Sequence, residues 1–331
     1  MYHIARRLAI TLSLSSVILG AKAQVAATDS LGEVRRDSVR RLDEVVVYAR
    51  QMLGSKFEAR NRTGSAYYLS PKELKKFGYT DISRMLRAVP GVNIYEEDGY
   101  GLRPNISLRG TKAERSERIS LMEDGILAAP APYAAPAAYY FPNAARMYAI
   151  EVLKGSSQVQ YGPFTTGGAV NMVSTPIPKS FQAGLRTSYG SFGTFNTYAH
   201  LGSDHKHVGY LVEYLRYQSK GFKKDEPNER TGFYRNDVVG KLRIHSDEDA
   251  EIRQALELKL GFSNEHSDES YVGLSEQDFA SRPYYRYRGA QMDQLQTRHT
   301  QTALTHLIDF TGGLKVTTSA YYNYFWRNWY K

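Results

Sequence analysis

The stretch that decides the fold is Ala149–Pro178, which reads AIEVLKGSSQVQYGPFTTGGAVNMVSTPIP. Its first run, IEVLKG, is rich in β-branched and aliphatic residues and predicts a strand that ends at Gly155. A second strand, AVNMVST, is predicted after a double glycine, and prolines end the segment at Pro178. Beyond Pro178 the chain becomes a series of long, tyrosine-rich segments in which polar and apolar residues alternate. A small mixed domain therefore ends here and a larger all-β domain begins.

The residues before this point predict an α+β domain from about residue 54 to Pro178. Ser70-Pro71-Lys72-Glu73 is typical of a helix start, with a serine cap, a proline at the first position and a glutamate at the third. Asp81 is expected to cap a second helix, which Pro90-Gly91 ends. Five strands are predicted, over Val92–Tyr95, Ile106–Arg109, Ile119–Met122, Ile150–Leu153 and Ala169–Ser174.

From Ser180 onward the sequence has a period of two, which predicts β-strands with one apolar and one polar face. In DVVGKLRIHS, the residues Val238, Leu242 and Ile244 alternate with Lys241, Arg243 and His245. Apolar residues facing out and charged residues facing in are typical of a barrel that faces lipid around a wet interior, whereas a soluble sandwich would swap the faces. About seven strands of roughly ten residues fit in this region. Short turns (Ser191–Gly193, Ser246–Ala250, Thr311–Gly313) are expected at one end and long loops (Ser219–Arg235, Glu265–Gln296) at the other.

The amino-acid composition excludes several classes of protein and leaves a membrane barrel possible. There is no cysteine, which excludes disulfides, a thiolate nucleophile and iron–sulfur clusters. The net charge is +9, but the lysines and arginines are scattered and form no continuous basic block, so nucleic-acid binding is not expected. The mean hydropathy is −0.49, but alternating strands average out as polar, so this value does not exclude a membrane barrel. The 26 tyrosines against 2 tryptophans suit either aromatic girdles at membrane interfaces or an ordinary tyrosine-rich β-protein.

The N-terminus predicts export. Residues 1–23 have the positive start, the apolar core and the Ala21-Lys22-Ala23 cleavage site of a signal peptide. The following residues, 24–53, are polar and predict a flexible tail. Within this tail, DEVVV (Asp43, Glu44, Val45, Val46, Val47) is a β-prone run, either a free strand that adds to a partner's sheet or the first strand of the next domain.

These features resemble one protein family. EVLKGSSQVQYGPFTTGGAVNMVST is similar to the end of the plug domain of TonB-dependent outer-membrane receptors, and so are DEVVV, ISLRG (Ile106–Gly110) and DGI (Asp124–Ile126). The run Asp124–Pro142 is similar to the ferric dicitrate transporter branch of that family. The resemblance covers the chain from about Asp43 to its end.

The resemblance implies a membrane β-barrel, antiparallel and up-and-down, with an N-terminal α+β plug domain. It assigns 43–47 as a TonB box in the periplasmic tail, 54–178 as the plug and 179–331 as the first barrel strands. The implied function is active uptake of a ferric, citrate-like chelate across the outer membrane of a Gram-negative bacterium. The implied partners are the TonB protein with its energising complex, outer-membrane lipid and the chelate. Haem, cobalamin or a glycan with a lipoprotein partner are the alternative cargoes.

Candidate ligand-binding residues lie in three loops. Arg109 ends ISLRG, and Arg115 and Arg118 follow in TKAERSER; arginine forks match the carboxylates of a polyanion, although a solvated loop paired with its own glutamates is equally compatible. Tyr133 lies in a proline-stiffened run, AAPAPYAAPAAYYFP, that is expected either to display aromatic side chains or to pack as a structural loop on the barrel wall. The third loop, RPYYRYR, contributes Arg282, Arg286 and Arg288, which could close over an anion or form a surface loop without a ligand.

No nucleophile–base pair is evident and the histidines lack ligand spacing, so neither an enzyme, a resident cofactor nor a metal site is expected. Barrels of the family have about 22 strands, and an open barrel would leave edge groups unsatisfied in lipid. We therefore expect either a truncated frame or fragment, or the remaining strands on another chain. A non-transporting fragment is the alternative to a receptor.

Overall fold

The computed structural model describes residues 51–77, 81–128, 140–155, 159, 161–162, 166–224, 231–310 and 313–331. All of these residues lie in the compact unit Arg40–Lys331. The predicted signal peptide (1–23), the predicted tail up to residue 50, and Asp43–Val47 within it lie outside the described residues. None of the helices in the described part of the chain has the length and the apolar character of a membrane-spanning helix.

The domain predicted over 54–178, called the plug below, is built on a five-stranded sheet with the order β1-β6-β7-β4-β5. β4 runs parallel to β7 and the other neighbours are antiparallel, while β2 and β3 pair separately. The strands are β1 Ser65–Leu69, β2 Val92–Tyr95, β3 Asn105–Leu108, β4 Ile119–Glu123, β5 Ile126–Leu127, β6 Met147–Lys154 and β7 Gly168–Ser174. All five predicted plug strands are present, and β1 and β5 are additional.

The short plug helices begin where the capping residues predict. Ser70 and Glu73 form a reciprocal cap at α3 (Pro71–Phe77), in which the backbone N–H and the hydroxyl of Ser70 donate to Glu73 Oε2 over 2.9 and 2.7 Å. Asp81 caps α4 (Ile82–Leu86) by accepting from the backbone N–H of Ser83 over 2.8 Å. A further helix, α2 (Lys56–Asn61), was not predicted, because its six residues show no apolar stripe.

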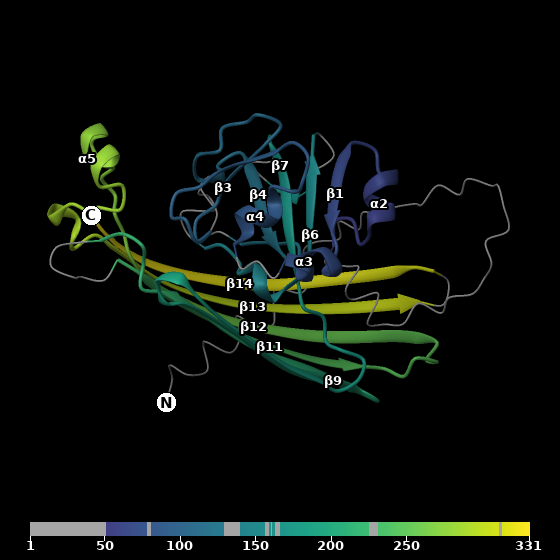
Figure 1. Cartoon of the computed structure of the whole chain (residues 1–331). Coiled ribbons are helices and arrows are strands. Elements are labelled where there is room, and N and C mark those ends of the chain that lie inside the picture. The colour runs from purple at the N-terminus through teal and green to yellow at the C-terminus, as the bar shows by residue number, and fades with distance from the viewer. Residues whose placement is uncertain are drawn as a thin grey trace, which may run out of the picture. The chain divides into compact units, whose positions relative to one another are not determined.

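The plug has its own apolar core between its sheet and its helices. Leu86, Ile106 and Ile150 are completely buried in it. The core is continuous with the wall described next, because Phe325 of β14 packs against its edge. The plug is therefore a folded domain that also rests on its neighbour (Figure 1).

The second half of the described chain is one antiparallel sheet of seven strands in sequence order, β8 to β14, called the wall below. The number of strands agrees with the prediction, but most of the strands are longer than the predicted ten residues, up to 17 in β12 and β13. The strands are β8 Gln182–Gly190, β9 Thr194–His205, β10 Val208–Ser219, β11 Phe233–His245, β12 Ile252–Asp268, β13 Gln294–Phe310 and β14 Lys315–Tyr330.

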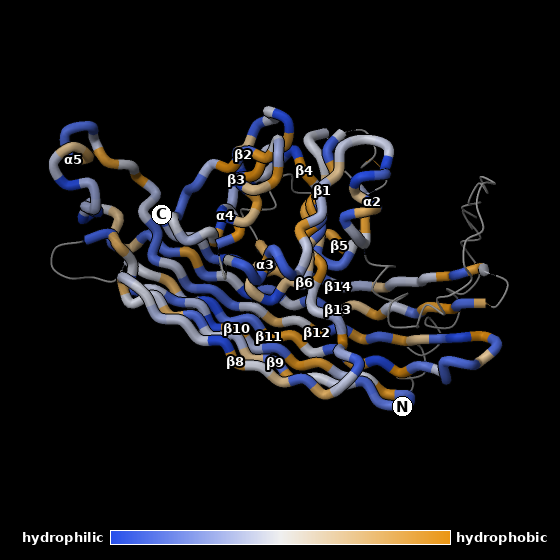
Figure 2. Tube along the Cα trace, turned by 45° about the vertical axis from the view of Figure 1, so that its right-hand side comes forward, coloured by the Kyte–Doolittle hydropathy of each residue, from blue (hydrophilic) through white to orange (hydrophobic). Residues whose placement is uncertain are grey.

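The two faces of the wall have the reverse of a soluble protein's polarity. On β11, Val238, Leu242 and Ile244 are 41%, 46% and 55% exposed, while Lys241 and Arg243 are 5% and 2% exposed. Apolar and polar residues alternate along the wall strands in Figure 2, and the plug lies on the charged face. The predicted arrangement, apolar out and charged in, is confirmed.

The two ends of the wall differ in their connections. The long connections 220–232 and 269–293 lie at one end, called the loop end, and the turns 206–207, 246–251 and 311–314 lie at the other, called the turn end. The assignment of Ser191–Gly193 to the short-turn end was wrong. This turn lies at the loop end, because the backbone N–H of Lys220 donates to the Phe192 carbonyl over 2.9 Å. The short turn 206–207, which sequence reasoning missed, takes its place.

Replacing Gly168 by alanine tests the packing of the plug. Gly168 has φ +149°, and a Cβ there would overlap Leu108 Cδ1 and the Leu153 carbonyl oxygen. We expect Gly168→Ala to lower the free energy of unfolding by about 1–3 kcal/mol. Gly190→Ala is the control, because nothing lies within 4 Å of its Cβ position. Equal stability of both variants in calorimetric unfolding would contradict the described packing.

Candidate functional site

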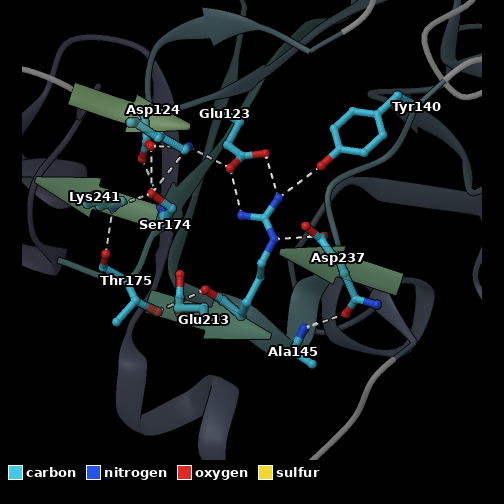
Figure 3. A network of polar contacts seen from close by, with 12 residues as sticks. Glu123, Asp124, Tyr140, Ala145, Ser174, Thr175, Glu213, Asp237 and Lys241 are labelled. Atoms are coloured by element: carbon cyan, nitrogen blue, oxygen red, sulfur yellow. Dashed lines mark hydrogen bonds and ion pairs between the residues drawn. The ribbon is translucent and has the colours of Figure 1, made fainter. Parts of the chain in front are cut away.

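The contact between the plug and the wall is a buried polar network. The period of two along β11 and β12 directs Asp237, Lys241 and Lys259 to the plug face, where each is at most 5% exposed. From the plug side, the network is met by β4, the turn after β4 and the end of β7 (Figure 3). Buried charges need partners, so each of these contacts restricts how the two parts can pack.

Arg146 is the centre of this network. It ends the short turn η3 (Ala144–Arg146), which begins where Asn143 Oδ1 accepts from the backbone N–H of Ala145 over 2.9 Å. The guanidinium donates to both carboxylate oxygens of Glu123 over 2.6 and 2.9 Å, and Nε donates to Asp237 Oδ2 over 2.8 Å. Glu123 belongs to the plug and Asp237 to the wall, so one planar group joins the two.

Lys259 of the wall reaches the same plug carboxylate. Its Nζ lies 2.6 Å from Glu123 Oε1 and 2.6 Å from Asp124 Oδ2. Asp124 has φ 54° in the tight turn Asp124-Gly125, which turns its carboxylate toward Lys259 and toward Ser174. Ser174 donates from Oγ to Asp124 Oδ2 over 2.5 Å and accepts from Lys241 Nζ over 2.7 Å.

The charges of this network fix its protonation. Burial alone would raise the pKa of Glu123, but Arg146 and Lys259 outweigh burial and lower that pKa to about 2. Burial would lower the pKa of Arg146, but Asp237 and Glu123 raise it well above its ordinary value. Glu123 and Arg146 are therefore both charged at neutral pH. Such a network adds less stability than apolar packing would, but removing one member leaves a buried, unpaired charge.

A second contact lies near the loop end. Arg103 of the plug is 5% exposed and pairs with Glu265 of β12 and, over 2.9 Å, with Glu269. Beside it, the ring of Tyr100 lies 4.9 Å from that of Phe233, and its hydroxyl accepts from Ser219 Oγ over 3.0 Å. The plug turn around residues 98–103 is thereby held against the ends of β10, β11 and β12.

Two of the predicted ligand residues, Arg115 and Arg118, lie in the turn that leads into β4. Arg115 Nη2 is 3.2 Å from Glu97, and its guanidinium lies 5.2 Å from the ring centre of Trp329 near the loop end of β14. Arg118 is exposed, with Nε 3.6 Å from Glu117. The structure thus gives both arginines acidic neighbours, and their role toward a ligand stays a prediction.

The other predicted plug residues are not joined to that pair by any described contact. Arg109 is exposed with φ 55°, and its Nη1 would lie 3.0 Å from a Cβ placed on Gly155, at the end of β6. Tyr133 lies outside the described residues. Ligand binding by Arg109 and Tyr133 stays a prediction.

The three arginines predicted in the loop after β12 differ from one another. Arg282 is exposed, 2.6 Å from Asp278 in α5 (Glu276–Ser281), and lies 3.9 Å from the ring centre of Tyr285. Arg286 is 2% exposed and donates to three carbonyl oxygens of its own loop, so it holds the loop together. Arg288 is exposed at the start of the turn η6 (Arg288–Ala290). Ligand binding by all three stays a prediction.

A cavity of about 760 Å³ lies between the plug and the first wall strands, β8 to β10. Its lining includes the basic side chains of Lys75, Lys179 and Arg186. None of the predicted ligand residues lines it. In the described part of the chain, no group of three or more His, Asp or Glu side chains could hold a metal ion.

Sequence reasoning missed the residues of the plug–wall network. It assigned Lys241 to the charged face of its strand and quoted Asp124 only as part of the motif DGI. It gave no role to Arg146, which stands alone in a run of small and apolar residues. The contacts between plug and wall in this network join residues 66 to 136 positions apart, so no local pattern could have identified the partners.

Comparison with known proteins finds a match for the plug and similar folds for the plug and wall together. Residues 58–169 match the model of the TonB-dependent receptor plug domain. The fold is similar to that of the ferric citrate transporter FecA in its unliganded form, with 21% identity, a TM-score of 0.72 and 84% of this chain covered. It is also similar to the ferric yersiniabactin uptake receptor FyuA from Yersinia pestis, with 18% identity, a TM-score of 0.62 and 82% covered. The chain spans 42% of the length of each of these two receptors.

Replacing Glu123 by glutamine tests the network. The variant leaves Arg146 and Lys259 short of a carboxylate, so we expect a loss of about 3–5 kcal/mol in the free energy of unfolding at neutral pH. Glu96→Gln is the control, because its ion pair with Arg87 is exposed and is expected to contribute at most about 1 kcal/mol. Calorimetric unfolding of the detergent-solubilised protein measures both variants.

The pH dependence has a definite sign. The pKa of Glu123 is lowered from 4.5 to about 2, so its contribution is complete above 4.5 and is lost as the pH falls toward 2. The stability difference between the wild type and Glu123→Gln should therefore be constant at neutral pH and shrink only below 4.5. A difference that shrinks already between about pH 7 and 5 would contradict the low pKa.

Proposed function

We propose that this chain, which carries the plug domain and the wall fold of TonB-dependent receptors, belongs to an outer-membrane receptor that takes up a ferric chelate. The observation that carries the proposal is the plug held by buried ion pairs on the charged face of a sheet whose other face is apolar. A sheet with this polarity suits lipid outside and a wet, occupied lumen inside. The family consists of transport receptors, so an enzymatic activity is not part of the proposal.

The orientation in the membrane follows from the two ends of the wall. Barrels of this kind have short periplasmic turns and longer extracellular loops. The loop end, with Arg103, Tyr100 and α5, would therefore face outward and the turn end would face the periplasm. The predicted signal peptide, residues 1–23, agrees with export to this membrane.

The proposed cargo is an anionic iron chelate of the citrate type. The exposed arginines Arg282 and Arg288 at the loop end, together with Arg115 in the plug, could meet carboxylates there. The two solved structures are named for ferric citrate and ferric yersiniabactin, which supports the broader class of ferric chelates. Calorimetry with ferric citrate and with haem would separate this cargo from the haem alternative.

The proposed cycle uses the plug–wall contact as its two-state element. The chelate binds at the loop end, TonB adds as a strand to Asp43–Val47 in the periplasm, and its pull shifts the plug from the wall. Ion pairs suit such a contact, because water can solvate their charges once the two surfaces separate. The chelate can bias the equilibrium only through contacts that differ between the two states.

Replacing Val45 by proline tests the division of roles. Proline removes a backbone donor from the strand that TonB would pair with, so uptake of iron-55 as ferric citrate by energised cells should be abolished. Binding of the chelate to the purified full-length receptor should stay unchanged. Val34→Pro, in the same tail but outside the box, is the control. Lost chelate binding, or normal uptake, in Val45→Pro would refute the proposed roles.

A further inference from the structure

Residues 52–54, called the seated segment below, are packed firmly onto the plug. The side chains of Met52 and Leu53 are each 6% exposed and lie in an apolar cluster with residues of β6 and β7. The Met52 carbonyl accepts from Arg62 Nη1 over 2.8 Å. The predicted TonB box ends at Val47, five residues before Met52, so a pull on the box would act on the seated segment before it acts on the sheet of the plug.

One buried carboxylate, that of Glu151 on β6, holds the backbone of the seated segment. The backbone N–H of Met52 donates to Glu151 Oε2 over 2.6 Å, and the N–H groups of Leu53 and Gly54 donate to Oε1 over 3.0 and 2.8 Å. Glu151 is completely buried, and its partners among the described residues are all N–H donors, with no lysine or arginine. Lifting the segment would therefore leave a buried carboxylate without most of its donors, which is a costly state.

Asn171 of β7 is the fourth donor to this carboxylate, and it has a second contact. It is the partner of Glu151 in the strand register and is also completely buried. Its Nδ2 donates to Glu151 Oε2 over 2.9 Å, and its Oδ1 accepts from the backbone N–H of Gly125 over 2.9 Å. One planar amide is thus held at both ends, so a movement that follows Glu151 strains the contact with Gly125.

The turn Asp124-Gly125 belongs to the part of the plug that contacts the wall. Asp124 Oδ2 lies 2.6 Å from Lys259 Nζ. The backbone N–H of Asp124 donates to the Met172 carbonyl over 3.1 Å, so β7 holds the turn at two neighbouring positions. A continuous chain of polar contacts therefore runs from the seated segment through β6 and β7 to the wall.

From this chain of contacts we propose that Glu151 and Asn171 are positioning residues that couple the seated segment to the contact between plug and wall. A pull that lifts the segment removes three donors from Glu151, displaces Asn171 and loosens the turn that meets Lys259. The inference rests on the proposed uptake cycle for the source of the pull. It deepens that cycle, because it names the route by which the pull reaches the wall.

Two variants lift the seated segment without a pull. Glu151→Gln replaces one carboxylate oxygen by an amide group that cannot accept from the backbone. Leu53→Asp keeps Glu151 but places a charge in an apolar pocket beside a buried carboxylate. In the purified full-length receptor, the acylation of individual lysines is followed by peptide mass spectrometry. The side chain of Lys259 is 2% exposed, so its acylation rate reports how often the contact between plug and wall opens.

We expect each variant to raise the acylation rate of Lys259 about tenfold, since a hydrogen bond to a charged group is lost at the start of the chain. Lys154, which donates to the Pro90 carbonyl over 2.6 Å inside the plug, should keep its rate. Unchanged Lys259 rates in both variants would overturn the coupling. An equal rise for Lys154 and Lys259 would also overturn it, because the plug would then be unfolding as a whole.

Glu73→Gln is the matched control. Glu73 also accepts a backbone N–H, from Ser70 at the start of α3, but its partners Ser70 and Lys56 lie outside the chain of contacts. The loss of this carboxylate should therefore leave the Lys259 rate at the wild-type value. A rise as large as that in Glu151→Gln would show that any weakened carboxylate in the plug opens the contact, and would overturn the specific role of Glu151.

Asn171→Ala tests the route in a double-mutant cycle. Alone, it should raise the Lys259 rate, because Gly125 loses its acceptor. When Glu151→Gln is added to Asn171→Ala, the further rise should be at most about twofold, since the connection is already broken. A further rise of about tenfold would show independent effects and overturn the route through Asn171.

These measurements are separate from the uptake assay. A wild-type receptor that fails to take up ferric citrate in energised cells would remove the proposed function, while the coupling measured in the purified receptor would stand. A receptor that takes up ferric citrate but shows unchanged Lys259 rates in both lifted variants would lose the coupling alone.

Discussion

The packing of the plug on the wall depends on one guanidinium, that of Arg146. It is held by Glu123 of the plug on one side and by Asp237 of the wall on the other, with the hydroxyl of Tyr140 2.9 Å from Nη2. A planar group with five donors in fixed directions can satisfy these partners only in one relative position. Apolar packing would tolerate small slips between the two surfaces, whereas this contact specifies the register of the plug against β11.

The composition of this contact also sets how it can be broken. Burying apolar side chains would hold the two parts together more strongly, because the cost of desolvating charges offsets much of the gain from an ion pair. Once water enters, however, the charges of Glu123, Arg146 and Lys259 can each be solvated. The plug keeps its own apolar core around Leu86 and Ile150, so it can lose the wall without losing that core. A plug that fills a water-filled lumen needs a contact with the wall that can open in this way.

The sequence predicted the elements whose causes are local. The cap of Ser70 on α3, the ends of β2 and β7, and the inverted polarity of β11 all follow from neighbouring residues and are present in the structure. The unpredicted strand β1 is only five residues long and shows no clear alternation, so its pairing with β6 alone defines it. The partners of Arg146 and Lys259 come from distant segments, and a single sequence carries no signal for such pairs. The burial of Arg286 inside its own loop was likewise unpredictable, because its neighbours Arg282 and Arg288 are exposed.

The two long connections at the loop end are tied to each other. The backbone N–H of Lys224 donates to the Tyr284 carbonyl over 2.6 Å, and the Lys224 carbonyl accepts from the backbone N–H of Arg286 over 3.0 Å. This parallel bridge joins Lys224 to Tyr285 of the loop after β12. The ring of Phe222, two residues before Lys224, lies 5.7 Å from the ring of Tyr100 in the plug. A displacement of the segment 222–224 would therefore reach Tyr100 of the plug through direct ring contact.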